Sequence, residues 1–556
     1  MKRLTIVLVA LFSYGIAKPE TLQSCDSPVY CQGDLLDTVQ RFQIFRDSKT
    51  FVDMSQVNSA NKTLDNFEKL MNNTNNKPTK EEVETFVEEN FVSKGELEDW
   101  TPPDFKSNPA FLKSIDDLVV RHFAKMLVSI WLDLGRKVKS EVNEDPDKYS
   151  LIPLPNGFIV PGGRFQEVYY WDSYWIIKGL LLSEMTDTAR GMLENFLSLV
   201  ERYGFIPNGS RVYYLNRSQP PLLALMVGLY IENTNDVHWL RQYIDVVEKE
   251  LKWWLSNRVI DVEKDGVNYT LAHYASESGT PRPESYFEDI STCLSFEDQV
   301  DKENCYKDIK SGAESGWDFS TRWFFDAESG TNTNLTGIQT RRVVPVDLNS
   351  YLCKAFKVMA QLYTRIGNDK KSYEWQKKSS SWQKSIERVL YDKEDGIWHD
   401  YDTVLSKPRK LFFPSNFAPL YCDCYDTAFR KKYGSRAAKY FVDQGINEYQ
   451  GGIPTSLKQG GEQWDMPNAW PPLQEMVILG LKNTGDSEAL KISENFAKRW
   501  VDANIIGYIN SKKMYEKYDT INSGRYGEGG EYNVQDGFGW TNGVALSIID
   551  IFYRRC

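Results

Sequence analysis

Most of the chain is divided into long segments whose apolar residues recur every three to four positions, with glycine- and proline-rich loops between them. This spacing places the apolar side chains on one face of an α-helix. Asp347 is expected to cap a helix that Gly367 ends, and Gly204 is expected to end another. The pattern predicts helices over residues 178–203, 220–230, 236–255, 347–366, 371–391, 470–481, 487–501 and 543–553.

The order of these segments indicates an all-α domain over residues 111–556. Strand signals are short and weak. Paired helices joined by long loops are typical of an α/α toroid, although a less regular helical array would give the same pattern. Residues 18–110 are polar, with a short acidic helix expected over residues 80–91, so this region is expected to form an N-terminal arm or cap.

The first 17 residues have the pattern of a secretory signal peptide. Lys2 and Arg3 precede an apolar run over residues 4–12. Small residues at positions 15–17 then form a cleavage site. The run is too short to span a bilayer, and neither a later stretch of roughly 20 apolar residues nor a hydrophobic tail for a lipid anchor is present. The sequence therefore predicts a secreted protein without stable membrane insertion.

Cysteine usage fits an oxidising compartment, because the chain has 8 cysteines in 556 residues. Cys25 and Cys31 could close a small loop, and Cys293 and Cys305 could pair around an acidic one. Cys422-Asp-Cys424 lacks the second cysteine pair or nearby histidine of a zinc site. The sequence leaves the complete pairing and the oligomeric state open.

Charge and histidine content narrow the class of function. The formal net charge is −11 and no long basic run occurs, so nucleic acid is not an expected partner. None of the 4 histidines has zinc-ligand spacing, which disfavours a metallohydrolase and a Ser-His-Asp enzyme. Carboxylates remain as candidate catalytic groups. The aromatic content of 13% fits a large aromatic core as well as a sugar-binding cleft.

Two stretches have the composition of a carbohydrate site. Residues 161–174 and 463–474 each place tryptophan, aspartate and amide or guanidinium groups around glycine and proline turns. Aromatic faces suit the C–H faces of a pyranose, and Asp, Gln and Arg suit its hydroxyl groups. These stretches indicate a sugar site before any catalytic residue is chosen.

Two carboxylates lie in sequence that suits acid–base chemistry. Asp318 follows Trp317, and a carboxyl group desolvated against tryptophan has the raised pKa of a general acid. The alternative is an aspartate that caps a helix. Glu516 precedes the glycine-rich residues 524–530 and Glu531, which suit a loop that closes over a ligand. The alternative there is a flexible surface turn with solvated acids.

Taken together, these segments resemble the trehalase family of inverting glycosidases, from about residue 25 to the C-terminus. Residues 161–174 and 463–472 match its two signatures, with Ala469 where glycine is frequent, and Glu528 interrupts the glycine run. The resemblance implies an (α/α)6 barrel, α,α-trehalose as the substrate and no metal or organic cofactor. It implies Asp318 as general acid and Glu516 as general base. It implies substrate contacts by Arg164, Trp171, Asp172, Asn208, Arg217, Ser218, Gln219, Arg282, Pro283, Glu284, Gly316 and Glu531, with Trp464 lining the cleft.

Two other functions stay open. One is a catalytically silent trehalose-binding protein, which would have little reason to keep both carboxylates. The other is a helical-barrel glycosidase for another substrate, such as a glucan exo-hydrolase, which the two signatures disfavour.

Overall fold

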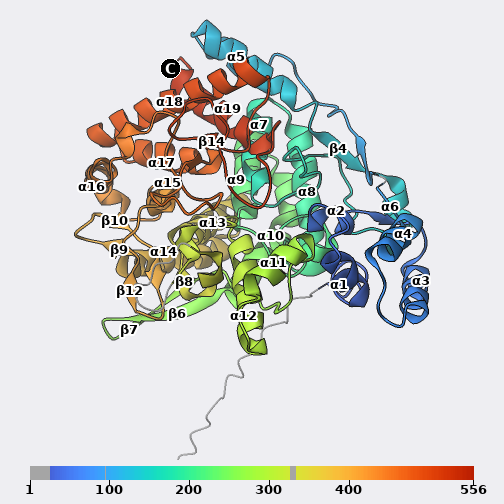
Figure 1. Cartoon of the computed structure of the whole chain (residues 1–556). Helices are drawn as coiled ribbons and strands as arrows, with labels where there is room; N and C mark the ends of the chain where they lie inside the picture. Colours follow the sequence, from blue (N-terminus) through green and yellow to red (C-terminus); the bar gives the residue numbers. More distant parts are fainter. Residues whose placement is uncertain (1–24, 94, 326–333, 556) are drawn as a thin grey trace, which may run out of the picture.

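The structure, a computed structural model, describes residues 25–93, 95–325 and 334–555. The predicted signal peptide lies outside these residues. Within them, six helices close a ring, each packed against the next and the last against the first (Figure 1). In ring order they are α7 (Asp172–Leu182), α9 (Leu223–Thr234), α13 (Val346–Arg365), α15 (Ala418–Tyr421), α17 (Pro471–Asn483) and α19 (Gly539–Tyr553).

A second set of helices covers the outside of this ring and alternates with it along the chain. Each outer helix packs on one or two inner ones. The outer helices are α5 (Leu118–Ile130), α8 (Thr186–Tyr203), α10 (Val237–Asn257), α14 (Asp369–Val389), α16 (Arg430–Asp443) and α18 (Ser487–Ser511). The architecture is therefore an (α/α)6 barrel, and the predicted all-α fold is confirmed.

The sequence of each helix explains its layer. The inner helix α9 is apolar on nearly every face, and its residues from Leu223 to Ile231 are buried except for Leu229, which is partly exposed. The outer helix α10 buries mainly one stripe, in which Leu240, Ile244, Val247, Leu251 and Trp254 recur every three or four positions. A helix that is apolar all round belongs inside a core, and an amphipathic one belongs on its surface.

Three details of the helix prediction were wrong. The segment predicted over residues 178–203 contains parts of two helices, α7 and α8, because Glu184 adopts a left-handed backbone conformation between them (φ 59°). Asp347 does not cap α13, whose N-cap is Pro345, because its carboxylate pairs with the buried Arg322. Helix α18 continues past residue 501 to Ser511. The predicted helix ends at Gly204 and Gly367 are confirmed, with φ of 83° and 79°.

The remaining elements lie in the loops and the arm. The longest strands, β6 (Val259–Lys264) and β7 (Val267–Ala272), form a hairpin. The other helices are α1 (Asp34–Arg41), α2 (Ser48–Val52), α3 (Ala60–Asn73), α4 (Lys80–Asn90), α6 (Ser140–Glu144), α11 (Tyr286–Cys293) and α12 (Gln299–Glu314). The other strands are β1 (Ser55–Gln56), β2 (Phe91–Val92), β3 (Leu97–Asp99), β4 (Gly135–Val138), β5 (Phe158–Ile159), β8 (Val343–Val344), β9 (Tyr391–Asp392), β10 (Ile397–Trp398), β11 (Tyr401–Asp402), β12 (Lys407–Pro408), β13 (Asn468–Ala469) and β14 (Tyr518–Asp519).

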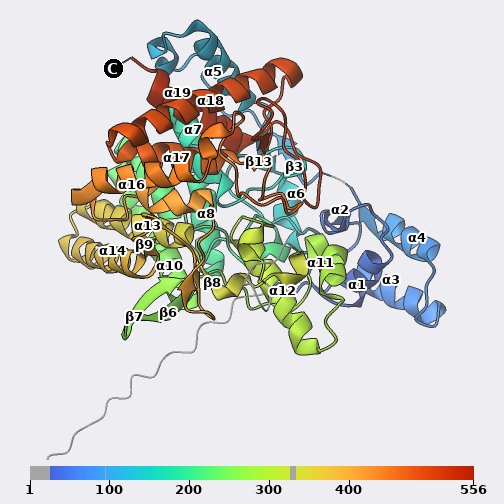
Figure 2. The ribbon, with the colours of Figure 1, turned by 60° about the vertical axis from the view of Figure 1, so that its left-hand side comes forward.

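The N-terminal arm packs onto loops of the barrel. Its own small core includes Tyr169, Tyr213 and Tyr214, which belong to the barrel segments. Helices α1 and α2 lie beside α11 (Figure 2). The Gln40 side chain donates a hydrogen bond to the Pro283 carbonyl oxygen. The arm therefore supports the loop that carries Arg282 to Glu284.

Disulfides join residues close in sequence and residues far apart. The predicted pairs Cys25–Cys31 and Cys293–Cys305 are present, together with Cys353–Cys424, which links α13 to the loop after α15. In the part of the chain that the structure describes, none of the helices has the length and hydropathy of a membrane-spanning segment.

Glu475 on α17 joins four of the inner helices through its buried carboxylate. It accepts hydrogen bonds from Trp175 and Lys178 on α7, at 2.9 and 2.6 Å. It also accepts from Tyr421 on α15 and Ser547 on α19, at 2.8 and 2.5 Å. Burial alone would raise the pKa of Glu475, but the charge of Lys178 and these donors hold it below its usual value.

Replacing Glu475 by leucine should lower the free energy of unfolding by about 3–5 kcal/mol, because it leaves the Lys178 ammonium group without its buried partner. Urea unfolding followed by tryptophan fluorescence would measure this change. Glu494→Leu, at an exposed position of α18, is the control and should change stability by less than about 0.5 kcal/mol. Equal effects of the two substitutions would contradict the cross-linking role of Glu475.

Candidate active site

A single pocket lies at the N-terminal ends of the inner helices. Its walls come from the segments that lead into α7, α9, α17 and α19 and from the insertion between α10 and α13. The predicted site residues in its lining are Arg164, Trp171, Asp172, Asn208, Arg217, Gln219, Arg282, Glu284, Gly316, Asp318, Glu516 and Glu531. Residues as far apart in sequence as Arg164 and Glu531 thus meet in one cavity.

Ser218 and Pro283 do not line this pocket. The Ser218 hydroxyl donates to the Ile206 carbonyl oxygen, and its backbone N–H donates to Glu314. The Pro283 carbonyl oxygen accepts from Gln40 of the arm. Each of the two residues lies between two pocket residues in sequence, and these hydrogen bonds fix the backbone there.

Asp318 lies in an extended segment after α12 and does not cap a helix. The following short 3-10 helix begins at Thr321 and has Ser320 as its cap. Burial, with the nearby charge of Glu531, raises the pKa of Asp318 to about 7, while Arg282 opposes that rise. This carboxyl group can therefore be protonated near neutral pH, as a general acid requires.

Gly316 brings the backbone close to the indole ring of Trp171. Its φ is 76°, and a Cβ atom at this position would lie 2.7 Å from that ring. A larger residue would both strain the backbone and displace Trp171. Gly316 thus sets how near the Asp318 segment comes to the aromatic wall.

The second signature holds the Asp318 segment in place. The Gln463 side chain donates to the backbone carbonyl oxygen of Asp318. The backbone N–H of Trp464 donates to the backbone carbonyl oxygen of Phe319 at 3.0 Å. Asp465 accepts from the N–H of Thr321 at 2.8 Å. This signature therefore contributes to the site by positioning as well as by lining the pocket.

Glu516 lies at the start of the segment that pairs, through β14, with β13 of the second signature. Its two carboxylate oxygens accept from the Tyr532 hydroxyl at 2.7 Å and from the Gln535 N–H at 3.1 Å. Burial raises the pKa of Glu516, and the charge of Lys517 and both hydrogen bonds oppose the rise. Donors aimed at the carboxylate favour its ionised form, which a general base requires.

Asp172 is a third acidic group in the pocket, at the first position of α7. Burial, together with the charges of Glu516 and Asp318, raises its pKa to about 8. At neutral pH its carboxyl group is therefore mostly protonated and can donate a hydrogen bond.

Three arginines line the pocket. Arg217 pairs with Glu284 at 2.7 Å, and Arg282 pairs with Glu531 at 3.1 Å. The Arg164 guanidinium group lies 5.1 Å from the centre of the Tyr532 ring. Charged pairs of this kind fix donors in place before a ligand arrives.

Tryptophan rings form the apolar wall. Trp464 and Trp470 stack with their ring centres 3.9 Å apart, and Trp171 and Trp540 lie against this stack. All four rings line the pocket. Such a wall suits the C–H face of a pyranose ring.

The sequence prediction missed several pocket residues. Asp47 and Lys49 reach the pocket from the arm, where polar sequence gave no signal of a site. A carboxylate oxygen of Asp47 lies 3.5 Å from an Nη of Arg164. The Lys49 Nζ lies 2.7 Å from a carboxylate oxygen of the buried Glu167. Tyr532 was within reach of prediction, because it directly follows Glu531 in the glycine-rich segment.

Comparison with known proteins identifies the family of this chain. The family model described as Trehalase matches residues 43–553. The chain is 53% identical to a trehalase of Tenebrio molitor, over 95% of this chain and 96% of that protein. It is 44% identical to a trehalase of Homo sapiens, over 99% of this chain and 94% of that one.

A solved structure shares the fold. The structure titled neutral trehalase Nth1 from Saccharomyces cerevisiae superposes with a TM-score of 0.53 at 22% identity, covering 71% of this chain and 73% of that chain. The match of the family model over nearly the whole chain, with the two full-length relatives, establishes that this chain belongs to the trehalase family of glycoside hydrolases.

Proposed function

We propose that this protein hydrolyses α,α-trehalose to two glucose molecules by an inverting mechanism, with Asp318 as the general acid and Glu516 as the general base. The observation that carries the proposal is the contrast between two buried carboxyl groups in one pocket. Burial raises the pKa of both groups, to about 7 for Asp318, but Tyr532 and Gln535 donate hydrogen bonds that oppose the rise at Glu516. The environments suit opposite protonation states, as an acid–base pair needs.

The reaction follows from these two states. Asp318 gives its proton to the oxygen that bridges the two anomeric carbons, so that one glucose leaves. Glu516 accepts a proton from a water molecule that attacks the opposite face of the anomeric carbon. Inverting glycosidases leave room for this water with carboxyl groups roughly 6.5–9.5 Å apart. A single displacement yields one β-glucose and one α-glucose.

The remaining pocket residues bind the two sugar rings. The tryptophan wall is assigned to the apolar ring faces, and Arg164, Arg217 and Arg282 to the hydroxyl oxygens. Asp172, Asn208, Gln219 and Glu284 add acceptors and donors. Hydrogen bonds between fixed polar groups and sugar hydroxyls discriminate strongly against ligands that lack a partner for them.

Two alternative functions are weighed by one assay, the release of glucose from trehalose, maltose and starch by the purified protein. The proposal expects glucose from trehalose and far less from the other two. Trehalose binding without hydrolysis at any pH would favour the silent binding protein. Faster release from maltose or starch would favour a glycosidase for another substrate.

Activity should fall as the pH rises above about 7. The general acid works only while Asp318 is protonated, so its active form is complete below its pKa of about 7 and declines above it. We expect kcat/KM for trehalose to fall about tenfold per pH unit well above this value. Initial rates between pH 4 and 9 measure this fall in kcat/KM. A constant kcat/KM from pH 6 to 9 would contradict the role of Asp318 as general acid. Because the charges of Asp172 and Glu531 are coupled to that of Asp318, the apparent pKa belongs to the carboxyl cluster.

We also infer that the protein is secreted. The N-terminal 17 residues have the pattern of a signal peptide. The described residues contain three disulfides. Disulfides persist in oxidising compartments and are rare in cytosolic proteins. Recovery of the enzyme from culture medium with residues 1–17 removed would test this inference.

A further inference from the structure

Arg282 lies where the acid segment meets the glycine-rich segment. Its guanidinium group is 5.1 Å from the centre of the Phe319 ring, next to Asp318. The same group pairs with Glu531 at 3.1 Å. Its charge also opposes the raised pKa of Asp318. A small displacement of Arg282 would therefore disturb both sides of the pocket.

Asp289 on α11 holds the same guanidinium group, and one Nη of Arg282 donates to both Asp289 and Glu531. The Asp289 carboxylate accepts from the backbone N–H of Arg282 at 2.8 Å. It also accepts from the side-chain Nε at 3.1 Å and from an Nη at 2.7 Å. Both residues are buried. Asp289 therefore fixes the backbone and the side chain of Arg282 at the same time.

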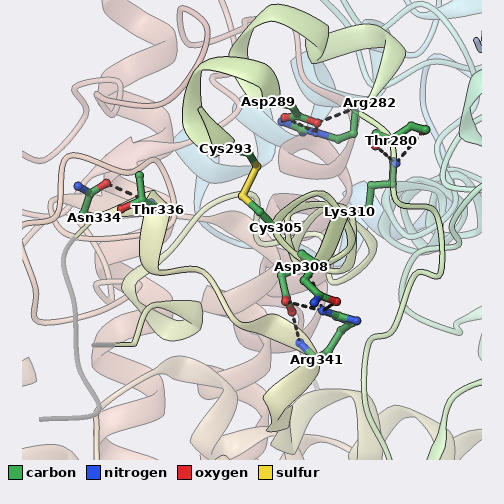
Figure 3. The surroundings of a disulfide bond; sticks show 11 residues. Thr280, Arg282, Asp289, Cys293, Cys305, Asp308, Lys310, Asn334, Thr336 and Arg341 are labelled. Carbon is green, nitrogen blue, oxygen red and sulfur yellow. Dashed lines mark hydrogen bonds and ion pairs between the residues drawn. A yellow bond between two sulfur atoms is a disulfide. The ribbon is translucent and has the colours of Figure 1, made fainter. Parts of the chain in front are cut away.

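Lys310 on α12 holds the segment that leads to Arg282. Its buried ammonium group donates to the Ser278 carbonyl oxygen at 3.0 Å and to the Ser278 hydroxyl at 2.8 Å. It also donates to the Thr280 carbonyl oxygen. Figure 3 shows Lys310 directed at Thr280, and Arg282 facing Asp289. Helix α11 thus binds Arg282 directly through Asp289, and helix α12 binds the residues just before it through Lys310.

The Cys293–Cys305 disulfide joins these two helices. Cys293 is the last residue of α11, and Cys305 lies within α12. Helix α11 has 8 residues, too few to be stable alone, and the turn after it is largely exposed. The arm secures the other end of α11, where Glu288 accepts from Ser48. The disulfide therefore secures the end of α11 that the arm does not reach.

We propose that the α11–α12 hairpin is the positioning element for Arg282, with Asp289 and Lys310 as its positioning residues and the Cys293–Cys305 disulfide as the tie between its helices. The inference rests on the proposed function, in which Arg282 contacts the substrate. It assigns to Asp289 a role that acts through Arg282 and not through a contact with the substrate.

The test is a double-mutant cycle on kcat/KM for trehalose. Asp289→Asn alone should raise KM about tenfold to a hundredfold and lower kcat less, because it loosens a substrate-binding group. In an Arg282→Met background, Asp289→Asn should have no further effect, since the group through which it acts is gone. Asp289→Glu should restore part of the loss. A residue with a merely structural role would lower kcat/KM in both backgrounds alike.

The disulfide is tested in the same cycle. Cys293→Ala with Cys305→Ala should raise KM severalfold in the wild-type background and leave KM unchanged in the Arg282→Met background. Cys25→Ala with Cys31→Ala removes a disulfide of the arm and is the matched control, with KM expected as in the wild type. Circular dichroism below the unfolding temperature checks that each variant is folded, and Lys310→Gln gives a second way to free the segment that leads to Arg282 if one variant does not fold.

The outcomes separate the two proposals. A folded Asp289→Asn variant with the KM of the wild type would overturn the positioning role while leaving the proposed function intact. Equal losses in both backgrounds would overturn it as well. A wild-type protein that releases no glucose from trehalose would overturn the proposed function and this inference with it.

Discussion

Asp318→Asn should lower kcat for trehalose by about 10²- to 10⁴-fold, the usual contribution of a positioned general acid. Asparagine has nearly the shape of aspartate but no proton to give to the bridging oxygen. KM should change little, because the pocket keeps its shape. Stopped assays of glucose release, with enough enzyme to detect the residual rate, measure the effect.

The leaving group distinguishes loss of the acid from damage to the pocket. Fluoride departs without protonation, so α-glucosyl fluoride should be hydrolysed by Asp318→Asn with a much smaller loss than trehalose. The exposed Asp443→Asn on α16 is the control and should keep the wild-type rate. An equal loss on both substrates would show that Asp318 is not the acid.

Glu516→Gln should lower kcat by a similar factor, about 10²- to 10⁴-fold, on trehalose and on α-glucosyl fluoride alike. Both substrates need an activated water, and glutamine cannot accept its proton. Added azide needs no base, so it should restore turnover in this variant and give β-glucosyl azide. Rates with and without azide, with product analysis by mass spectrometry, measure the rescue.

A matched control for Glu516→Gln is Glu528→Gln in the glycine-rich segment. The Glu528 side chain is exposed, and its backbone makes the hydrogen bonds to Asn468. This variant should keep activity within about twofold of the wild type, as surface substitutions usually do. Azide rescue of Asp318→Asn instead of Glu516→Gln would reverse the assigned roles.

The periodicity of apolar residues was sufficient to predict most of the helices of the two barrel layers, but not α5, α15 and α16. It could not predict the ring, because closure depends on contacts such as α19 against α7, between segments more than 350 positions apart. It also could not distinguish capping from ion pairing at Asp347, where Arg322 outweighs the local preference of aspartate for a helix N-terminus. Local signals describe a helix but not its neighbours.

The motifs were sufficient to predict most of the pocket lining. They could not predict Asp47 and Lys49, because the arm reaches the pocket through packing with Tyr169 and Tyr213 and not through any local pattern. They also gave Asp465 no role, although its carboxylate holds Thr321 beside the acid segment. Residues that act by holding others have no signature of their own.

The most direct test of the central claim is proton NMR of the purified enzyme with trehalose, which follows the anomeric signals from the earliest time. The inverting mechanism predicts equal initial amounts of α- and β-glucose, before mutarotation mixes them. Initial release of α-glucose alone would show retention and would contradict the roles of Asp318 and Glu516.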